Sequence, residues 1–283
     1  MNRNPKPATR NPERSEVLEE LYCHYNRFEH IHPDPLEFVY LYDRKTDREI
    51  SAFIASALAY GRVQQILKSV RFVLDAMGPS PSSFLLKNRP ADIQEAFKSF
   101  KHRFTTGEFL ANLLVSLGKL IKEYGSLESC FKAGFSEQDQ NILPALTELV
   151  KKIEQAGGRT MPTFLPSPDG GSACKRLNLF LRWMVRSDDV DPGIWQSIPA
   201  SHLIVPLDTH LHRIAVAMGL TSRKQADMRC AIEITRAFGS IRPDDPVRYD
   251  FALTRLGIKP GDPFTKFFTS LLSTGEQGWK IAK

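Results

Sequence analysis

Residues 165–220 read LPSPDGGSACKRLNLFLRWMVRSDDVDPGIWQSIPASHLIVPLDTHLHRIAVAMGL, and this stretch holds two well-marked helix starts. A turn rich in glycine ends at Gly171, and an amphipathic pattern then predicts a helix over Ser172–Val185. Asp208 follows a Pro-Leu pair and stands where an aspartate caps a helix, which predicts a second helix over Thr209–Met218. The stretch therefore predicts helices separated by Gly and Pro turns.

The same helical period continues on both sides of this stretch. Thr46 and Glu49 form a capping-box signature ahead of apolar residues spaced for one buried helix face, namely Ile50, Phe53, Ile54, Ala57 and Leu58. Thr105 and Glu108 repeat the signature. Further helices are predicted over Val63–Met77, Asn141–Gln155, Ser222–Phe238 and Pro246–Leu256. Since strand-like alternation is absent, we expect an all-α protein with a dozen or so helices.

Composition and charge limit the classes of function. The 283 residues carry a formal net charge of +6, which favours polyanionic partners, although many soluble proteins are equally basic and bind no nucleic acid. No apolar run is long enough to cross a bilayer, and residues 1–14 resemble a disordered basic tail more than a signal peptide. We therefore expect a cytoplasmic protein with no membrane partner.

The four cysteines do not form a metal-binding pattern. Cys23, Cys130, Cys174 and Cys230 are isolated in the sequence, which leaves no ligand set for a zinc ribbon or an iron–sulfur cluster. Isolated cysteines are typical of a reducing compartment. We expect no metal and no iron–sulfur cluster.

Lys175 is the first candidate for chemistry. It falls in the first turn of the helix predicted after Gly170-Gly171, where backbone N–H groups and the positive helix end favour an anion such as phosphate. The same surroundings favour a neutral amine, which is the nucleophilic form. The alternative is a surface lysine on a solvated polar face that also carries Asn178, Arg182 and Arg186.

Asp208 is the second candidate. Its position predicts an N-cap, and this structural role alone would explain the residue. A carboxylate at a helix start is also held rigidly and kept ionised, which suits proton acceptance or stabilisation of positive charge. Capping and catalysis are therefore compatible at this position.

The segments around these two residues resemble the helix-hairpin-helix DNA glycosylase superfamily. Leu165-Pro166, the glycine turn and Lys175-Arg176-Leu177-Asn178 are similar to the hairpin and following helix of endonuclease III-type enzymes. Pro206-Leu207-Asp208-Thr209-His210, then Arg213 and Met218-Gly219-Leu220, are similar to their aspartate loop and next helix. With less specific motifs, the likeness covers roughly residues 46–258. The phrases KRLNLFLRWMVR, VPLDTH and DPVRYDFALTRLGI also resemble an uncharacterised bacterial family tied to this superfamily.

The resemblance implies roles for particular residues. Lys175 matches the lysine that attacks C1′ of a damaged nucleotide, and Asp208 matches the aspartate that assists departure of the base. Gly170 and Gly171 match the hairpin that grips the phosphate backbone, and we place Arg176 and Arg213 with them as DNA-binding residues. A lysine nucleophile forms a Schiff base with the sugar, which implies AP-lyase as well as glycosylase activity.

Three departures from the endonuclease III pattern indicate which branch of the superfamily the chain resembles. The turn between Leu165 and Lys175 is longer than the usual hairpin and contains Pro168 and Asp169. Lys175 and Asp208 are 33 residues apart, which is closer to the archaeal 8-oxoguanine DNA glycosylases with their modified hairpin. The cluster-binding cysteines of endonuclease III are also missing. Together these features point to oxidised guanine as the substrate.

The remaining candidates are less specific. Tyr60, Gln64, Phe104 and Trp183 are candidates for a pocket that holds a flipped base, although aromatic residues are more often part of a core. His210 and His212 point to opposite sides of a helix and make a poor metal pair. No P-loop or dinucleotide-binding fingerprint is present, so we expect no cofactor.

These observations predict a two-lobed, glycosylase-like helical monomer with double-stranded DNA in the cleft between its lobes. One lobe would comprise residues 46–186 with the modified hairpin, and the other residues 15–45 with 187–283. The expected activity is removal of a damaged base, followed by nicking of the strand. Two alternatives remain: a non-catalytic nucleic-acid-binding module, or an enzyme that acts on RNA or on a modified nucleoside.

Overall fold

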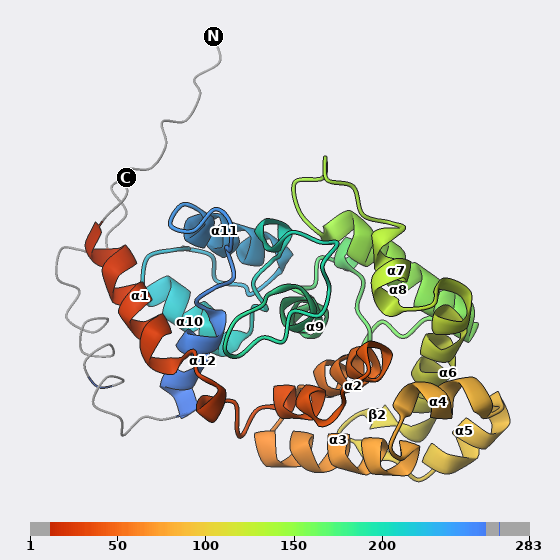
Figure 1. Ribbon diagram of the computed structural model, residues 1–283. Helices are drawn as coiled ribbons and strands as arrows, with labels where there is room; N and C mark the ends of the chain where they lie inside the picture. The colour runs from red at the N-terminus through yellow and green to blue at the C-terminus, as the bar shows by residue number, and fades with distance from the viewer. Residues whose placement is uncertain (1–11, 259–265, 267–283) are drawn as a thin grey trace.

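A computed structural model describes residues 12–258 and residue 266, and it confirms the all-α class (Figure 1). Two antiparallel strands, β1 (Lys101–His102) and β2 (Thr105–Thr106), form the only sheet of this described part. Its twelve α-helices are α1 (Pro12–Tyr25), α2 (Lys45–Ala57), α3 (Val63–Met77), α4 (Pro81–Lys87), α5 (Pro90–Phe97), α6 (Gly107–Tyr124), α7 (Leu127–Lys132), α8 (Leu143–Gly157), α9 (Lys175–Val185), α10 (Thr209–Ala217), α11 (Met228–Gly239) and α12 (Asp250–Ile258). Short 3-10 helices cover Phe28–His30, Pro35–Leu41, Pro168–Gly170 and Ala200–His202.

Two predictions, the basic tail and the second lobe, include residues at the ends of the chain. The predicted tail of residues 1–14 was wrong at its end, because α1 already begins at Pro12. Residues 1–11, and residues 259–265 and 267–283 of the second predicted lobe, lie outside the described part. Within the described part, no helix is both long and apolar enough to span a membrane.

The predicted N-terminal cap of α2 does not form, because Glu49 contacts residues that are far away in the sequence. Helix α2 begins at Lys45, ahead of the predicted cap at Thr46. The Glu49 carboxylate instead accepts hydrogen bonds from the backbone N–H groups of Leu127 and Glu128 and from Nε1 of Trp195. Glu49 therefore satisfies the N-terminus of α7, and the capping box predicted for α2 was wrong.

Helix α11 begins six residues later than predicted. Its N-cap is Asp227, whose carboxylate accepts from the backbone N–H of Cys230 at 2.8 Å. Helix α12 likewise begins at Asp250, because residues 245–250 form turns in which Arg248 N donates to Asp245 O. In both places an aspartate further along the chain marks the true helix start.

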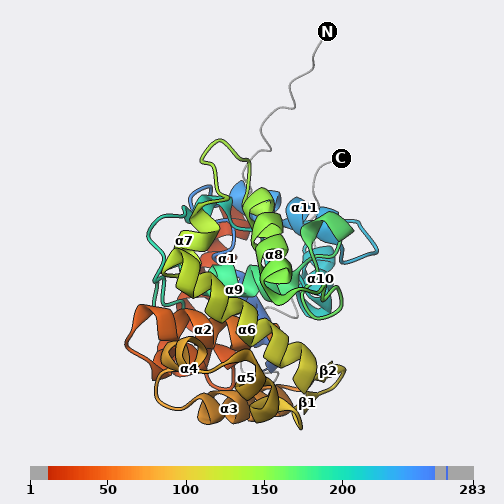
Figure 2. The ribbon, with the colours of Figure 1, turned by 90° about the vertical axis from the view of Figure 1, so that its right-hand side faces the viewer.

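Helix α9 lies in the middle of the molecule (Figure 1). In that view α1, α10 and α12 lie on one side of it and α6 and α8 on the other, and a quarter turn brings α6 and α8 to the front (Figure 2). Helix α9 packs against α2, and α12 packs against both α1 and α10. One continuous hydrophobic cluster of buried side chains extends from Leu18 to Leu256.

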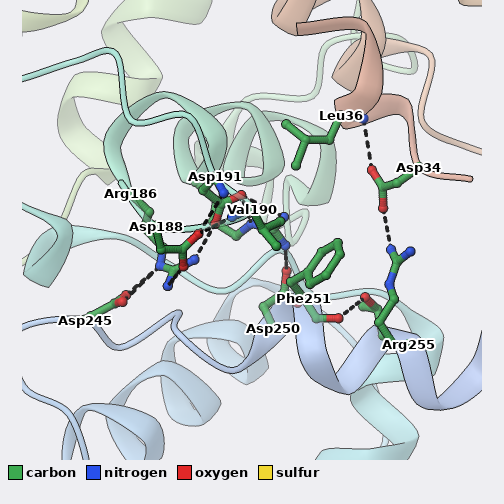
Figure 3. Close-up of polar contacts among 12 residues, drawn as sticks. Asp34, Leu36, Arg186, Asp188, Val190, Asp191, Asp245, Asp250, Phe251 and Arg255 are labelled. Carbon is green, nitrogen blue, oxygen red and sulfur yellow. Dashed lines mark hydrogen bonds and ion pairs between the residues drawn. The ribbon is translucent and has the colours of Figure 1, made fainter. Parts of the chain in front are cut away.

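A buried network of charges holds α9 in place. Arg186, whose side chain is 3% exposed, forms ion pairs with Asp188, Asp191 and Asp245 (Figure 3). Arg182, one turn earlier, pairs with Asp191 and with Asp250. The polar face predicted as a possible solvated surface is therefore interior, where each guanidinium needs carboxylate partners.

Candidate active site

Lys175 is the first residue of α9, and the backbone before it has an unusual conformation. Cys174, the N-cap residue, is buried and left-handed, with φ 47° and ψ 38°. Gly171, three residues earlier, is also left-handed with φ 76°, a conformation that glycine adopts readily. A non-glycine residue in this region is uncommon and is typical of functional sites. These two turns direct the chain into α9 with the Lys175 side chain about one-third exposed.

Asp208 is the N-cap of α10, as the sequence predicted. Its Oδ1 accepts from the backbone N–H groups of His210 at 2.9 Å and Leu211 at 2.8 Å. Its other oxygen, Oδ2, lies 3.1 Å from Nζ of Lys175. The amine and the carboxylate, 33 residues apart in sequence, therefore meet in one ion pair.

The ion pair fixes the charge of the carboxylate. Burial alone would raise the pKa of Asp208, but Lys175 and the N–H groups of Leu211 and His210 lower it by more. The pKa of Asp208 therefore lies below its ordinary value of 3.8. A depressed acid pKa stabilises the folded state above the unfolded pKa, and this stabilisation is lost as the pH falls through the folded value.

A pH titration should show this coupling. Between about pH 7 and pH 5 the Asp208 carboxyl should remain ionised, because its pKa lies below that of the unfolded chain. Lys175→Met should raise the pKa of Asp208, because it removes the ammonium and leaves the carboxylate buried. Carbon-13 NMR of the carboxyl group would measure both. An Asp208 pKa that stays the same in Lys175→Met would contradict the coupling, and Lys98→Met is the control.

Two cavities meet at this ion pair. We call the outer one the groove; it has a volume of about 610 Å³, and its walls include Tyr60, Gly171, Cys174, Arg176, Thr209 and Asp227. We call the inner one the recess; it has a volume of about 290 Å³, and its walls include Asp34, Ile66, Leu179, Arg182, Asp250 and Arg255. Ala59, Lys175 and Asp208 line both. A molecule that occupies both cavities would therefore pass directly by the amine and the carboxylate.

A family model described as "Protein of unknown function (DUF2400)" matches residues 34–259. The chain belongs to this family. The matched range contains Lys175, Asp208 and every residue named for the groove and the recess, so the DUF2400 match covers the whole candidate site. No curated protein matches the chain, and no solved structure matches it.

The predicted DNA-binding residues of this DUF2400 chain have different surroundings. Gly170 and Gly171 are exposed, with open space where a side chain would project, and Gly171 lines the groove. Arg176 also lines the groove, but its guanidinium donates to the carbonyl oxygens of Ala57 at 3.0 Å and Thr163 at 2.8 Å. Arg213 is exposed on α10 and lines neither cavity. Arg176 thus connects α2 to the segment that precedes the 3-10 helix Pro168–Gly170.

The predicted base-pocket residues do not form one pocket. Trp183 is fully buried in the core of the DUF2400 chain, so its prediction as a pocket residue was wrong. Gln64 is exposed on α3 and lines neither cavity. Tyr60 lines the groove and stacks on Phe104, with ring centroids 5.2 Å apart. Phe104 is 67% exposed in the turn between β1 and β2 and lines neither cavity.

The charged wall of the recess was not predicted. Arg182, Asp250 and Arg255 are at most 2% exposed, yet all three line the recess together with Asp34. Arg255 donates to Asp34 Oδ2 at 2.5 Å and to the carbonyl oxygen of His30 at 3.1 Å. These residues come from three distant segments, and no local sequence pattern signals that they meet. Among the described residues, no group of His, Cys, Asp or Glu side chains could hold a metal ion.

Proposed function

We propose that this protein is a DNA glycosylase with AP-lyase activity, in which Lys175 is the nucleophile and Asp208 the adjacent carboxylate. The observation that carries the proposal is the 3.1 Å Lys175–Asp208 ion pair at the junction of the groove and the recess. An amine beside a carboxylate, with one cavity for a polymer backbone and one for a base, suits attack on a sugar carbon.

The chemistry requires that the amine lose a proton. In the resting pair Asp208 Oδ2 lies 3.1 Å from Nζ, so it accepts the ammonium proton while the two groups are in contact and later passes that proton to the departing base. Lys175 Nζ then bonds to C1′ while the C1′–base bond breaks, and the base leaves with that electron pair and takes up a proton. Opening of the sugar ring gives a Schiff base, with O4′ protonated. Loss of a C2′ proton and of the 3′ phosphate then nicks the strand.

Other features support a nucleic-acid substrate. The exposed backbone at Gly171 borders the groove, and the chain carries a net charge of +6. The packing of α12 against α1 and α10 fits the lobe that we propose from residues 15–45 and 187–283. We propose that a monomer binds duplex DNA along the groove, with the damaged base, an oxidised guanine in the first instance, extruded toward the ion pair.

Borohydride trapping tests the proposal. The wild-type protein, incubated with duplex DNA that contains an abasic site and then reduced, should form a covalent adduct that denaturing electrophoresis resolves. Lys175→Ala should abolish the adduct, because no Schiff base can form. Lys98→Ala is the control. It removes a lysine whose side chain is 68% exposed in its ion pair with Glu95, and it should leave the adduct intact.

Two results would overturn the proposal. One is the absence of an adduct and of nicking with wild-type protein on abasic and 8-oxoguanine duplexes, even if DNA binds in a salt-sensitive way; this would favour a non-catalytic module. The other is an adduct that survives Lys175→Ala. RNA and free nucleosides should be run in parallel, since preferential turnover of either would indicate a different substrate class.

A further inference from the structure

We propose that the recess receives the extruded base and that Asp250 selects it by accepting a hydrogen bond from an N–H group on the base. This inference rests on the proposed function and assigns a specificity-determining residue to it. Asp250 is the first residue of α12, and its side chain is 2% exposed while the residue lines the recess. A buried carboxylate that faces a cavity is costly unless its acceptor atoms are used.

One oxygen of Asp250 is already used for folding. Arg182 Nη1 donates to Asp250 Oδ2, and Arg182 also donates through Nε and Nη2 to Asp191 (Figure 3 labels both aspartates). No described residue donates to the other oxygen, Oδ1. Burial raises the pKa of Asp250, and the Arg182 guanidinium opposes that rise. Arg182 therefore holds the carboxylate in one orientation and leaves Oδ1 for a ligand.

In the other two carboxylates of the recess, both oxygens already have partners. Asp208 accepts two backbone N–H groups through Oδ1 and pairs with Lys175 through Oδ2. Asp34 accepts from Leu36 N at 3.0 Å through Oδ1 and from Arg255 through Oδ2 (Figure 3). Asp250 Oδ1 is thus the one carboxylate oxygen of the recess without a donor among the described residues.

The rest of the recess suits a flat heterocycle. Ala59, Ile66 and Leu179 are apolar parts of its wall, and a volume of about 290 Å³ accommodates one base. A carboxylate oxygen accepts hydrogen bonds and cannot donate them when ionised, so it favours a base with a ring N–H or an amino group at that edge. A base methylated on that nitrogen presents no donor and leaves Oδ1 unpaired, which such sites reject strongly.

The test compares base release with nicking of a preformed abasic site, because the second reaction needs no base in the recess. Duplexes would carry 8-oxoguanine, hypoxanthine, uracil or an abasic site, together with N1-methylhypoxanthine and 3-methyluracil as blocked counterparts. Asp250→Asn keeps the shape and presents an amide N–H₂ to the recess. We expect the ratio of base release to abasic nicking to fall at least about 100-fold for the preferred base. The methylated counterparts should be poor substrates of the wild type.

Two further variants complete the test. Asp245→Asn removes a matched carboxylate that pairs with Arg186 outside the recess, and it should leave the ratio unchanged. Ile66→Phe narrows the recess without altering charge, and it should lower the ratio even if Asp250→Asn fails to fold. Wild type without either reaction would overturn the proposed function and this inference together. Abasic nicking with an unchanged ratio in Asp250→Asn, or in Ile66→Phe, would overturn this inference alone.

Discussion

Asp208→Asn should lower the rate of base release by roughly 10²–10⁴-fold and change the free energy of unfolding by less than about 1 kcal/mol. Asparagine caps a helix about as well as aspartate, so the N–H groups of His210 and Leu211 keep an acceptor. It is neutral, however, and can neither take the proton from Lys175 nor stabilise positive charge on the sugar. Single-turnover release of 8-oxoguanine and urea unfolding measure the two quantities.

Asp208→Asn separates the helix-capping role of Asp208 from its proposed catalytic role, which the sequence alone does not distinguish. Asp92→Asn is a matched control, since Asp92 forms an exposed ion pair with Arg89 in the first turn of α5. Base release by Asp208→Asn within threefold of the wild type would mean that the residue is only a cap. A large loss of stability in Asp208→Asn would mean that the ion pair with Lys175 mainly supports folding.

Arg186→Met should lower the free energy of unfolding by about 3–5 kcal/mol. The substitution keeps much of the side-chain volume but leaves the carboxylates of Asp188, Asp191 and Asp245 without their shared guanidinium. Buried carboxylates that lose their counter-charge are strongly destabilising, because the interior does not solvate them as water does. Urea unfolding followed by circular dichroism would give the difference.

Lys98→Met is the matched control for this loss of a cation. Lys98 and its partner Glu95 are 68% and 69% exposed, so the change should be within about 0.5 kcal/mol. If Arg186→Met were as stable as Lys98→Met, the network would not be needed to hold α9. Recovery of stability when Asp245→Asn is added to Arg186→Met would confirm that unpaired carboxylates cause the loss.

Local signals predicted the parts of the site that lie next to helix starts. The all-α class followed from the period of apolar residues, and α3 was predicted with its observed limits because Gly78 ends it. The Asp208 cap was predicted because an aspartate before a helix satisfies N–H groups two and three residues along the chain. The resemblance to the glycosylases singled out Lys175 and Asp208, and the two side chains form a 3.1 Å ion pair.

Contacts between distant segments were not predicted, for a physical reason. Glu49 caps α7 instead of its own helix. The sequence around a carboxylate does not indicate which distant N–H groups it will contact. The recess brings together Asp34, Arg182 and Arg255, and no local pattern specifies that meeting. Trp183 was predicted as a pocket residue, but its periodic position on α9 made it part of the core.

Arg182 belongs both to the interior charge network and to the wall of the recess. Any replacement there alters the stability of the molecule at the same time as the shape of the inner cavity. Evolution toward a different ligand is therefore constrained at the charged residues and much freer at the apolar positions Pro35, Ile66 and Leu179. Divergent family members should accordingly vary in the hydrocarbon part of this wall while they retain its arginines and aspartates.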